Sequence, residues 1–378
     1  MSFSFVKEHL AQQKRQHRLR KCTAIEGVSG SNIVVAGKAY LNFSSNDYLG
    51  LNNHPQIIKA LAEGAEKYGV SSSASSLVTG YNFAHQALED TIASWLNKEK
   101  VLLFTSGFSA NHALMQALGK KESLLLLDKL SHASIIDGAL ASEATTKRYL
   151  HNNYQQLEDL CLRNSDKNIL IATESVFSMD GDETDTQRIA EIAKQYKACS
   201  YVDEAHSFGI KGDLGQGSSA ADIDIVMATF GKAVATSGAF VACNNEIYDY
   251  LINFARHYIY STAMSPAIAW ATRKSIELIQ CEHWRRENLT HLEHLFKSEL
   301  DNSINLLPTT SPIHAINVND EAKALAASKK LREKGIWVTA IRPPTVPNGT
   351  SRLRVTICAN HNESNIKYLA ESLNEVLV

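Results

Sequence analysis

Residues 100–118 read KVLLFTSGFSANHALMQAL, and this stretch decides the fold class. Its first five residues form an apolar run typical of a strand that is buried on both faces. Residues 111–118 place apolar side chains three and four positions apart, as an amphipathic helix does. A strand that leads through a short turn of small residues into a helix is the repeating unit of a parallel α/β sheet.

The same alternation continues along the chain. A hairpin is expected at 33–43, around Gly37, and a further helix at 189–196. The predicted fold is therefore α/β: a large domain with a mostly parallel sheet flanked by helices. Further buried strands are expected at 124–128 (LLLLD), 168–173 (NILIAT), 200–203 (SYVD), 225–229 (IVMAT) and 238–243 (GAFVAC).

The last third of the chain predicts a second, smaller unit. A long helical stretch from about 265 to 300 leads into a strand at 313–318 and a helix near 321–334. Strands at 336–341 and 352–357 and a closing helix complete a small α+β domain. The expected organisation is an N-terminal arm and hairpin at 1–45, a large domain at 46–265 and a small C-terminal domain at 266–378.

Composition excludes several classes of protein. Hydrophobic residues make up 44% of the 378 positions and charged residues 21%, so the chain is not disordered. Lys and Arg total 38 against 40 Asp and Glu, which argues against a nucleic-acid partner. No apolar run is long enough to span a membrane, and no signal peptide is expected. Six scattered cysteines suit a reducing, cytoplasmic location.

Ligands of open parallel sheets bind beyond the carboxyl ends of the strands. Five of the expected strands end in polar residues, although each fragment alone is more often structural than functional. Together they offer a turn that can hold a phosphate, two imidazoles, a carboxylate and an amine, which suits an aromatic, phosphorylated, carbonyl-bearing cofactor. These fragments are TSGFSAN at 105–111, KLSH at 129–132, ESVFSMDGD at 174–182, DEAH at 203–206 and FGK at 230–232.

Two other patterns point to functions that the sequence does not support. The DEAH string also occurs in ATP-driven helicases, but Gly231 and Lys232 are followed by Ala233, so the GK[ST] end of a phosphate loop is missing. His291 and His294 could share a helix face, yet no convergent carboxylates accompany them. No metal site is predicted.

Over almost its whole length the sequence resembles the α-oxoamine synthases, which are pyridoxal 5′-phosphate (PLP) enzymes of transferase fold type I. The resemblance is closest to the branch of biotin biosynthesis, and the IRPPTVP element favours that branch. It rests on FSSNDYLGL (43–51), TGYNFAHQALE (79–89), FTSGFSAN (104–111), LDKLSHASIIDGA (127–139), ESVFSMDGD (174–182), VDEAHSFG (202–209), TFGKA (229–233), IYSTAMSP (259–266) and IRPPTVPNGTSRLR (341–354).

The resemblance implies a role for each matching residue. Lys232 would form the Schiff base with PLP and act as general base, and an ionised Asp203 would pair with the pyridine nitrogen. His206 would contact the ring oxygen, and His132 would stack on the ring face. The other implied cofactor contacts are the Gly107 and Phe108 amides, Ser178, Thr229 and, reaching the phosphate of a partner subunit, Thr262.

The same resemblance implies the substrates. Arg354 would hold the carboxylate of L-alanine through two parallel hydrogen bonds. Alanine would condense with pimeloyl-acyl carrier protein or pimeloyl-CoA, with loss of carbon dioxide and release of the thiol. A homodimer is implied, because the family forms its active site between two subunits. The other implied substrate contacts are Arg20, Asn46 and Thr345.

Two alternatives remain beside this interpretation. Residues 69–76 read GVSSSASS, whereas the family usually has several glycines in this segment. The acyl-chain preference is therefore the part of the interpretation that this sequence supports least. Another α-oxoamine synthase, such as a glycine C-acetyltransferase or an autoinducer synthase, is the second choice. A non-catalytic interaction module would be expected to lose Lys232 or Asp203, and the chain keeps both.

Overall fold

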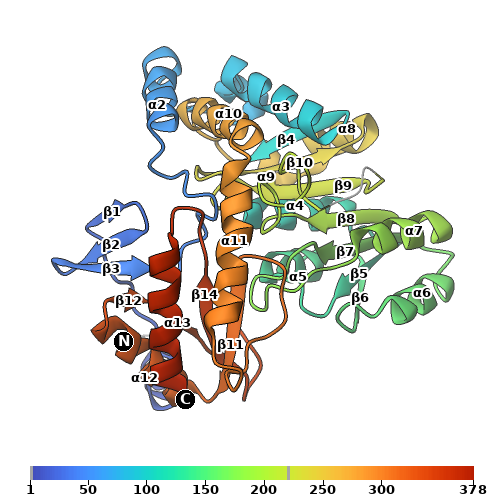
Figure 1. The fold of residues 1–378 in the computed structure, drawn as a ribbon. Helices are drawn as coiled ribbons and strands as arrows, with labels where there is room; N and C mark the ends of the chain where they lie inside the picture. The colour runs from blue at the N-terminus through green and yellow to red at the C-terminus, as the bar shows by residue number, and fades with distance from the viewer. Residues whose placement is uncertain (1–2, 219–221) are drawn as a thin grey trace. The chain divides into compact units, whose positions relative to one another are not determined.

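The computed structural model describes residues 3–218 and 222–378 (Figure 1). The chain folds into two compact units. Unit 1 consists of Met1–Gly50, Met179–Gly181 and Arg285–Val378, and unit 2 of Leu51–Ser178 and Asp182–Trp284. The three-part division expected from the sequence stays a prediction.

Unit 2 is built on a sheet that contains seven strands in the described part of the chain, in the order β4-β10-β9-β8-β7-β5-β6. Every strand except β10 runs in the same direction, and β10 is antiparallel to both of its neighbours. The carboxyl ends of the other strands therefore meet at one edge. The strands are β4 (Lys100–Phe104), β5 (Ser123–Asp128), β6 (Thr145–Tyr149), β7 (Asn168–Glu174), β8 (Cys199–Asp203), β9 (Ile225–Thr229) and β10 (Ala239–Cys243).

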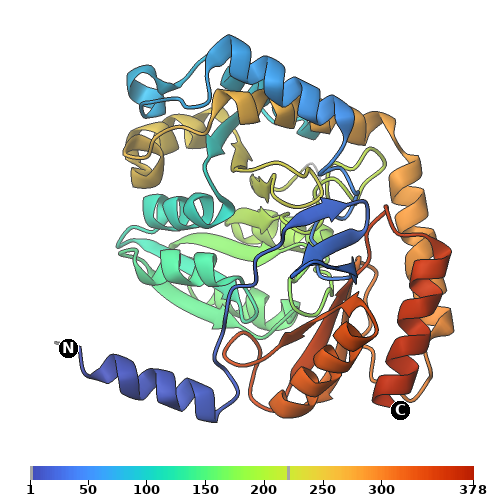
Figure 2. The ribbon, with the colours of Figure 1, turned by 90° about the vertical axis from the view of Figure 1, so that its left-hand side faces the viewer.

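Helices alternate with these strands and cover the sheet. The later helix α10 packs along α2 and α3 from the start of the unit (Figure 2). The helical elements of unit 2 are α2 (Pro55–Tyr68), η1 (Ser76–Gly80), α3 (Phe83–Leu96), α4 (Gly107–Leu118), α5 (Ala133–Leu140), α6 (Tyr154–Leu162), α7 (Thr186–Tyr196), α8 (Asn245–Phe254), α9 (Arg256–Ile259) and α10 (Pro266–Cys281).

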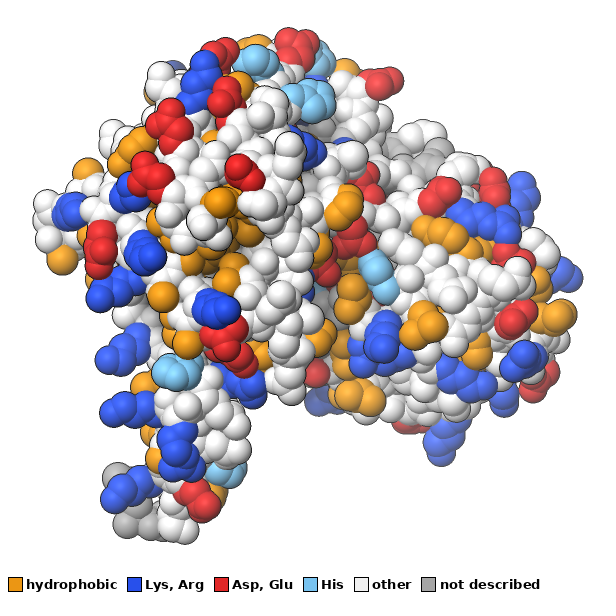
Figure 3. Space-filling model, turned by 60° about the horizontal axis from the view of Figure 1, so that its bottom comes forward, with side chains coloured by type: hydrophobic (Ala, Val, Ile, Leu, Met, Phe, Trp, Pro, Cys, Tyr) orange, Lys and Arg blue, Asp and Glu red, His pale blue; other side chains and the backbone are white. Residues whose placement is uncertain are grey.

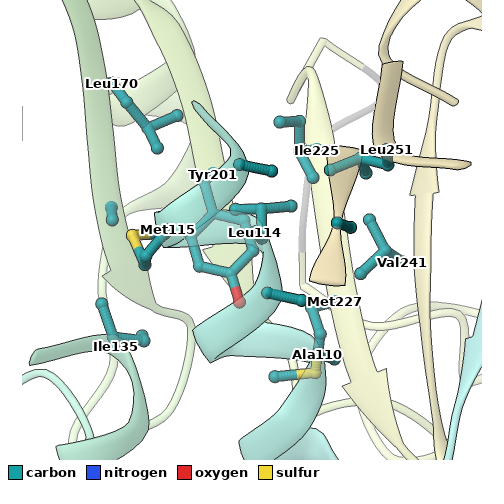
Figure 4. Packing of buried hydrophobic residues seen from close by; sticks show 14 of the residues in the cluster. Ala110, Leu114, Met115, Ile135, Leu170, Tyr201, Ile225, Met227, Val241 and Leu251 are labelled. Carbon is teal, nitrogen blue, oxygen red and sulfur yellow. The ribbon is translucent and has the colours of Figure 1, made fainter. Parts of the chain in front are cut away.

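The main core lies between α4, α5 and one face of the sheet (Figure 4). Alternate residues of each strand point to this face, because side chains alternate along a strand. Leu125 with Leu127 and Ile225 with Met227 are such pairs, and Leu114 of α4 is buried among them. Packing against the apolar strands therefore holds α4 rigidly in place, and the residues at its N-terminal end are held in place with it.

The structure confirms the strand and helix pattern and corrects three details. The helical stretch expected at 265–300 is two helices, α10 and α11 (Trp284–Glu299), because the helix ends at Glu282. Strand β6 was not predicted, since its sequence TTKRY is polar and it lies at the edge of the sheet. The single strand expected at 336–341 is two strands that join different sheets.

Unit 1 combines the two ends of the chain. Its described strands form one sheet in the order β1-β2-β3-β12 and another in the order β11-β14-β13. No described helix of the chain is both long and apolar enough to cross a membrane. Besides α11, the elements are α1 (Phe5–Arg15), β1 (Gly27–Ser29), β2 (Asn32–Val35), β3 (Lys38–Asn42), β11 (Ile313–Asn319), α12 (Glu321–Glu333), β12 (Ile336–Trp337), β13 (Thr339–Ile341), β14 (Ser351–Thr356) and α13 (Glu363–Leu377).

Candidate active site

The polar strand ends of unit 2 surround one cavity of about 210 Å³. Asp203 and Glu174 are the last residues of the neighbouring strands β8 and β7, and Thr229 is the last residue of β9. The predicted convergence at the carboxyl edge of the sheet is therefore present. The lining residues are Gly107, Phe108, Asn111, His132, Ser134, Glu174, Asp203, Ala205, His206, Met227, Thr229 and Lys232.

Lys232 and His206 form the amine side of the cavity. The Lys232 Nζ atom lies 2.8 Å from His206 Nε2, which is hydrogen-bond distance. His206 is only 6% exposed, so its ring cannot turn freely into solvent. The backbone N–H of Gly231 donates to Thr229 Oγ1 at 3.2 Å, which shapes the turn that carries Lys232.

Asp203 is held by two donors from different elements. The backbone N–H of Ala205 donates to its Oδ1 atom at 2.9 Å. The side-chain amide of Asn111, on α4, donates to Oδ2 at 2.8 Å. The hydroxyl of Tyr201 donates to the oxygen of the same amide, so the nitrogen of Asn111 must face Asp203. The carboxylate is 4% exposed and is fixed in orientation before any ligand binds.

His132 presents a neutral ring to the cavity. Its Nδ1 atom lies 2.7 Å from Ser134 Oγ and accepts from the Ser134 backbone N–H at 3.3 Å. Burial lowers the pKa of His132, the charge of Asp203 opposes this, and that of Lys232 adds to it. An imidazole with a lowered pKa and an accepting Nδ1 carries its single proton on Nε2.

Glu174 ends β7 directly beside Asp203, which is its partner in the parallel register of β7 and β8. Complete burial raises the pKa of Glu174 well above its ordinary value, and the negative charge of Asp203 raises it further. Two adjacent buried carboxyl groups do not both ionise near neutral pH. The raised pKa of Glu174 favours its protonated form beside Asp203.

The turn predicted to hold a phosphate is the N-terminus of α4. Ser106 caps the helix by accepting from the Ser109 backbone N–H at 3.1 Å, and Ser109 Oγ accepts from the Ser106 N–H in return. Gly107 and Phe108 follow as the first helical residues. The first N–H groups of a helix have no acceptor within it and favour negative charge, so this end can bind an anion.

Two of the residues expected to contact the cofactor are not among the described residues that line the cavity. Ser178 follows β7 in the loop of residues 176–183. Thr262 forms an isolated antiparallel bridge with Ser75. The Ser-rich segment next to Ser75 contains a non-glycine residue in the left-handed region, Ser73, with φ of +55°. This backbone favours glycine, the residue type expected in this segment.

The four residues expected to bind substrates lie in unit 1 and form two pairs. Arg354, on β14, donates from Nη1 to Asn46 Oδ1 at 3.2 Å, and its side chain is largely buried. Arg20 donates from Nη2 to Thr345 Oγ1 at 2.7 Å, and both residues are exposed.

Among the lining residues to which the sequence analysis gave no role are Asn111 and Glu174, although both lie in the polar fragments that follow β4 and the apolar part of β7. Each residue nevertheless has a feature in the sequence that indicates a role. Asn111 is a polar residue on the buried face of α4, where its neighbours are apolar. Glu174 ends an apolar strand beside the strand that ends in Asp203. Buried polar groups usually have partners, so each position pointed to a bonded network.

Comparison with known proteins gives concordant results. Residues 38–373 match the family of class I and II aminotransferases. The 8-amino-7-oxononanoate synthase of Photobacterium profundum is 44% identical over 382 residues, which cover 99% of this chain and 97% of the relative.

Two solved structures are also similar. A variant of serine palmitoyltransferase from S. paucimobilis with a bound PLP–myriocin aldimine is 27% identical, with a TM-score of 0.91, covering 99% of this chain and 97% of that one. The 8-amino-7-oxononanoate synthase from Francisella tularensis is 31% identical, with a TM-score of 0.77, covering 89% and 97%.

Proposed function

This chain belongs to the class I and II aminotransferase family and, within it, to the 8-amino-7-oxononanoate synthases, and from that premise we propose which residues carry its reaction. It is a PLP-dependent enzyme that transfers an acyl group to an amino acid with loss of carbon dioxide. Its substrates are L-alanine and a pimeloyl thioester. The observation that carries the assignment of residues is the convergence of Lys232, His206 and Asp203 on one cavity.

The residues of the cavity match the chemical groups of PLP. Lys232 would hold the aldehyde carbon, Asp203 the pyridine nitrogen, and His206 the ring oxygen. The amides of Gly107 and Phe108 at the N-terminus of α4 would hold the phosphate. When bound, PLP supplies a protonated aromatic ring that accepts the electron pair left on the α-carbon of the amino acid.

Asp203 would favour a protonated ring nitrogen, because its carboxylate would offer that nitrogen a negative partner. Asn111 and Ala205 orient the carboxylate, and the raised pKa of Glu174 lowers the tendency of that neighbour to carry a competing negative charge. The neutral imidazole of His132 offers a flat surface to the ring without adding a positive charge. These contacts are preorganised, so little reorganisation is needed during the reaction.

Lys232 is the group that moves the proton. Its amine would take the α-proton of alanine and return a proton later in the cycle. His206 Nε2, 2.8 Å away, can share the proton held on Nζ and keep the amine in place. Lys232 has no other described amine beside it in the lining of the cavity, so no second lysine competes for this role.

The pairs in unit 1 would bind the substrates. Arg354 is a largely buried guanidinium, and its planar fork matches a carboxylate bidentately, so we assign it the carboxylate of alanine, with Asn46 orienting it. Arg20 and Thr345 form an exposed polar pair that suits the pimeloyl thioester. Ser178 is assigned a polar contact to PLP.

We propose a homodimer as the working form. The segment around η1 exposes several large apolar side chains, among them Val78 at 73%, and exposed apolar groups of this kind mark interaction surfaces. Thr262 pairs with Ser75 beside this segment, which supports a contact to the partner's phosphate. Analytical ultracentrifugation tests the dimer. The cytoplasmic location stays a prediction.

A screen of thiol release tests the proposed function. Purified protein is supplied with PLP, one amino acid (alanine, glycine or serine) and one thioester (pimeloyl, acetyl or palmitoyl). We expect pimeloyl thioester with alanine to react fastest, by about tenfold or more over glycine or serine. Faster release from glycine with acetyl-CoA would assign the chain to another α-oxoamine synthase instead.

A further inference from the structure

A histidine at the carboxyl edge of the sheet in unit 2 lies between two carboxylates, and the reaction as proposed uses none of the three. His151 follows β6, Asp128 is the last residue of β5, and Asp182 lies in the loop of residues 176–183 after β7. The Nδ1 atom of His151 lies 3.0 Å from Asp128 Oδ1, and its Nε2 atom bonds Asp182 Oδ2. The three residues therefore connect the ends of three neighbouring strands, β6, β5 and β7.

The two contacts indicate a positively charged ring at His151. A carboxylate accepts hydrogen bonds and donates none, so each ring nitrogen faces an acceptor, and only the imidazolium has two N–H groups. Although burial lowers the pKa of His151, its bonds to Asp128 and Asp182 raise it to about 9. Asp128 is fully buried, and a buried carboxylate needs such a partner. The ring therefore carries its charge at neutral pH and holds both carboxylates at once.

Asp128 connects His151 to the turn that presents His132. The backbone N–H of Leu130 donates at 2.7 Å to Asp128 Oδ1, which is the oxygen that the histidine contacts. The backbone N–H of Ser131 donates to the Asp128 carbonyl at 3.1 Å. The turn ends at His132, which lines the cavity. A shift of the Asp128 carboxylate would therefore move the backbone that leads to His132.

Asp182 connects His151 to the loop that carries Ser178. An isolated antiparallel bridge joins the two ends of this loop, and the Phe177 N–H donates to the Asp182 carbonyl at 2.9 Å. The buried ring of Phe177 lies perpendicular to that of His151, with the ring centroids 4.4 Å apart. His151 therefore contacts the loop on both sides of Ser178.

Ion pairs on the surface differ from this arrangement. Figure 3 shows Lys and Arg side chains interspersed with Asp and Glu over one face of the molecule. Exposed pairs of this kind contribute little to the free energy of unfolding. The side chain of Asp128 is 0% exposed and that of His151 is 26% exposed, so water and salt screen their bond less. His151 can therefore fix its neighbours more firmly than a surface ion pair can.

We propose that His151 is a positioning residue for the cofactor: it holds the turn of His132 and the loop of Ser178 in the arrangement that receives PLP. His151 is not among the described residues that line the cavity, so it acts through these two segments. The inference rests on the proposed function, in which His132 faces the ring of PLP and Ser178 contacts the cofactor. Without His151 both segments would have to be ordered by the cofactor itself, and that cost would lower the affinity for PLP.

The affinity for PLP tests this role. His151→Gln keeps one donor for Asp128 but loses the positive charge and turns an amide oxygen towards Asp182. We expect the Kd of PLP, titrated into protein from which it has been removed, to rise about tenfold. The visible circular dichroism of bound PLP should weaken, because the ring is held less firmly. Asp182→Asn alone keeps the histidine and its bond to Asp128, and should raise the Kd about threefold.

A second substitution separates positioning from general destabilisation. Asp182→Asn in the His151→Gln protein replaces the facing carboxylate by an amide that can donate to the glutamine oxygen. We expect it to bring the Kd back to within about threefold of that of the unaltered protein. The matched control is Arg188→Gln, because Arg188 also lies between two carboxylates of unit 2, those of Glu158 and Glu191. This control should leave the Kd and the circular dichroism unchanged.

Three outcomes overturn the positioning role. They are an unchanged Kd in His151→Gln, an equal rise in Arg188→Gln, and a double variant that binds PLP no better than His151→Gln. If His151→Gln does not fold, an unchanged Kd in Asp182→Asn overturns the role instead. An unaltered protein that binds PLP but releases no thiol contradicts the proposed function alone, and the Kd values still decide the role of His151. A chain that bound no PLP would refute both.

Discussion

The two units hold their functional residues in different ways. In unit 2, Asp203 is buried and bonded by Asn111 and Ala205, and these residues follow from strands and helices of one packed core. In unit 1, Arg20 and Thr345 are exposed and meet through one side-chain bond. If the proposed roles hold, packed elements position the cofactor and the carboxylate of alanine, since Arg354 also lies largely buried on a strand, whereas the exposed pair of Arg20 and Thr345 is the part that can vary with the acyl substrate.

Removing the amine should have the largest effect on this arrangement. Lys232→Ala should lower the rate of thiol release by at least about 10⁴-fold, because the group that moves the proton is lost. The purified protein should also lose the yellow colour of bound PLP and its borohydride label. A borohydride label found on another lysine of the variant would contradict the role of Lys232.

Neutralising the carboxylate tests whether charge or shape matters in unit 2. Asp203→Asn should lower kcat about 10³-fold while keeping the fold, because the amide has the same size but no negative charge. Asn111→Ala removes one hydrogen bond to the carboxylate but keeps its charge. We therefore expect kcat to fall less than in Asp203→Asn. If Asp203→Asn retained more than half of the activity, the electrostatic role of Asp203 would be refuted.

A change in unit 1 should separate binding from chemistry. Arg354→Lys keeps the charge but loses the planar fork, so we expect the KM for alanine to rise about 10- to 100-fold. The absorbance of bound PLP should stay unchanged, because all the residues proposed to contact the cofactor lie in unit 2. Loss of the cofactor in this variant would show that the two units do not divide the work as proposed.

The charges that stabilise unit 2 should make its stability depend on pH. His151 bonds Asp128 and Asp182, and these bonds outweigh burial and raise its pKa to about 9. A raised pKa in the folded state adds stability that is full below about 6.5 and is lost as the pH rises through 9. Thermal melts should therefore show a falling Tm from pH 6.5 to 9.5, and His151→Gln should flatten that slope. An equal slope in the two proteins would show that His151 is not the cause of the pH dependence of Tm.

The smallest expected effect concerns the one strained position of the serine-rich segment. Ser73→Gly should stabilise the protein by about 0.5–1 kcal/mol, because glycine adopts the left-handed backbone freely. The matched control is Ser75→Gly, where the backbone is extended and glycine should destabilise. Calorimetry that gave both changes the same sign would show that backbone strain at Ser73 is absent.

The sequence predicted the scaffold of unit 2 better than its details. Apolar runs such as NILIAT mark buried strands wherever they lie, so the ends of those strands could be located. The polar edge strand β6 has no such run. Strand β10 runs antiparallel to its neighbours β4 and β9. The pattern of apolar residues along a strand does not reveal in which direction the strand runs in the sheet.

The site shows the same limit. Lys232, His206 and Asp203 were identified because each follows an apolar run and matches a family motif. The parts played by Asn111 and Glu174 depend on Tyr201 and Asp203, which lie far away in the chain. Such roles are properties of spatial neighbours, and one sequence does not reveal them.

The pairing of β3 with β12 has a consequence for how the protein is made in the cell. Strands β1, β2 and β3 can pair with one another early, but the outer edge of β3 has no partner until β12, in the last part of the chain, has left the ribosome. Unit 2 can close earlier. Contacts between such distant segments form slowly. During synthesis the early strands expose unpaired edges, which invite aggregation. Slower translation at reduced temperature, or a chaperone that covers these edges, should raise the yield of folded enzyme.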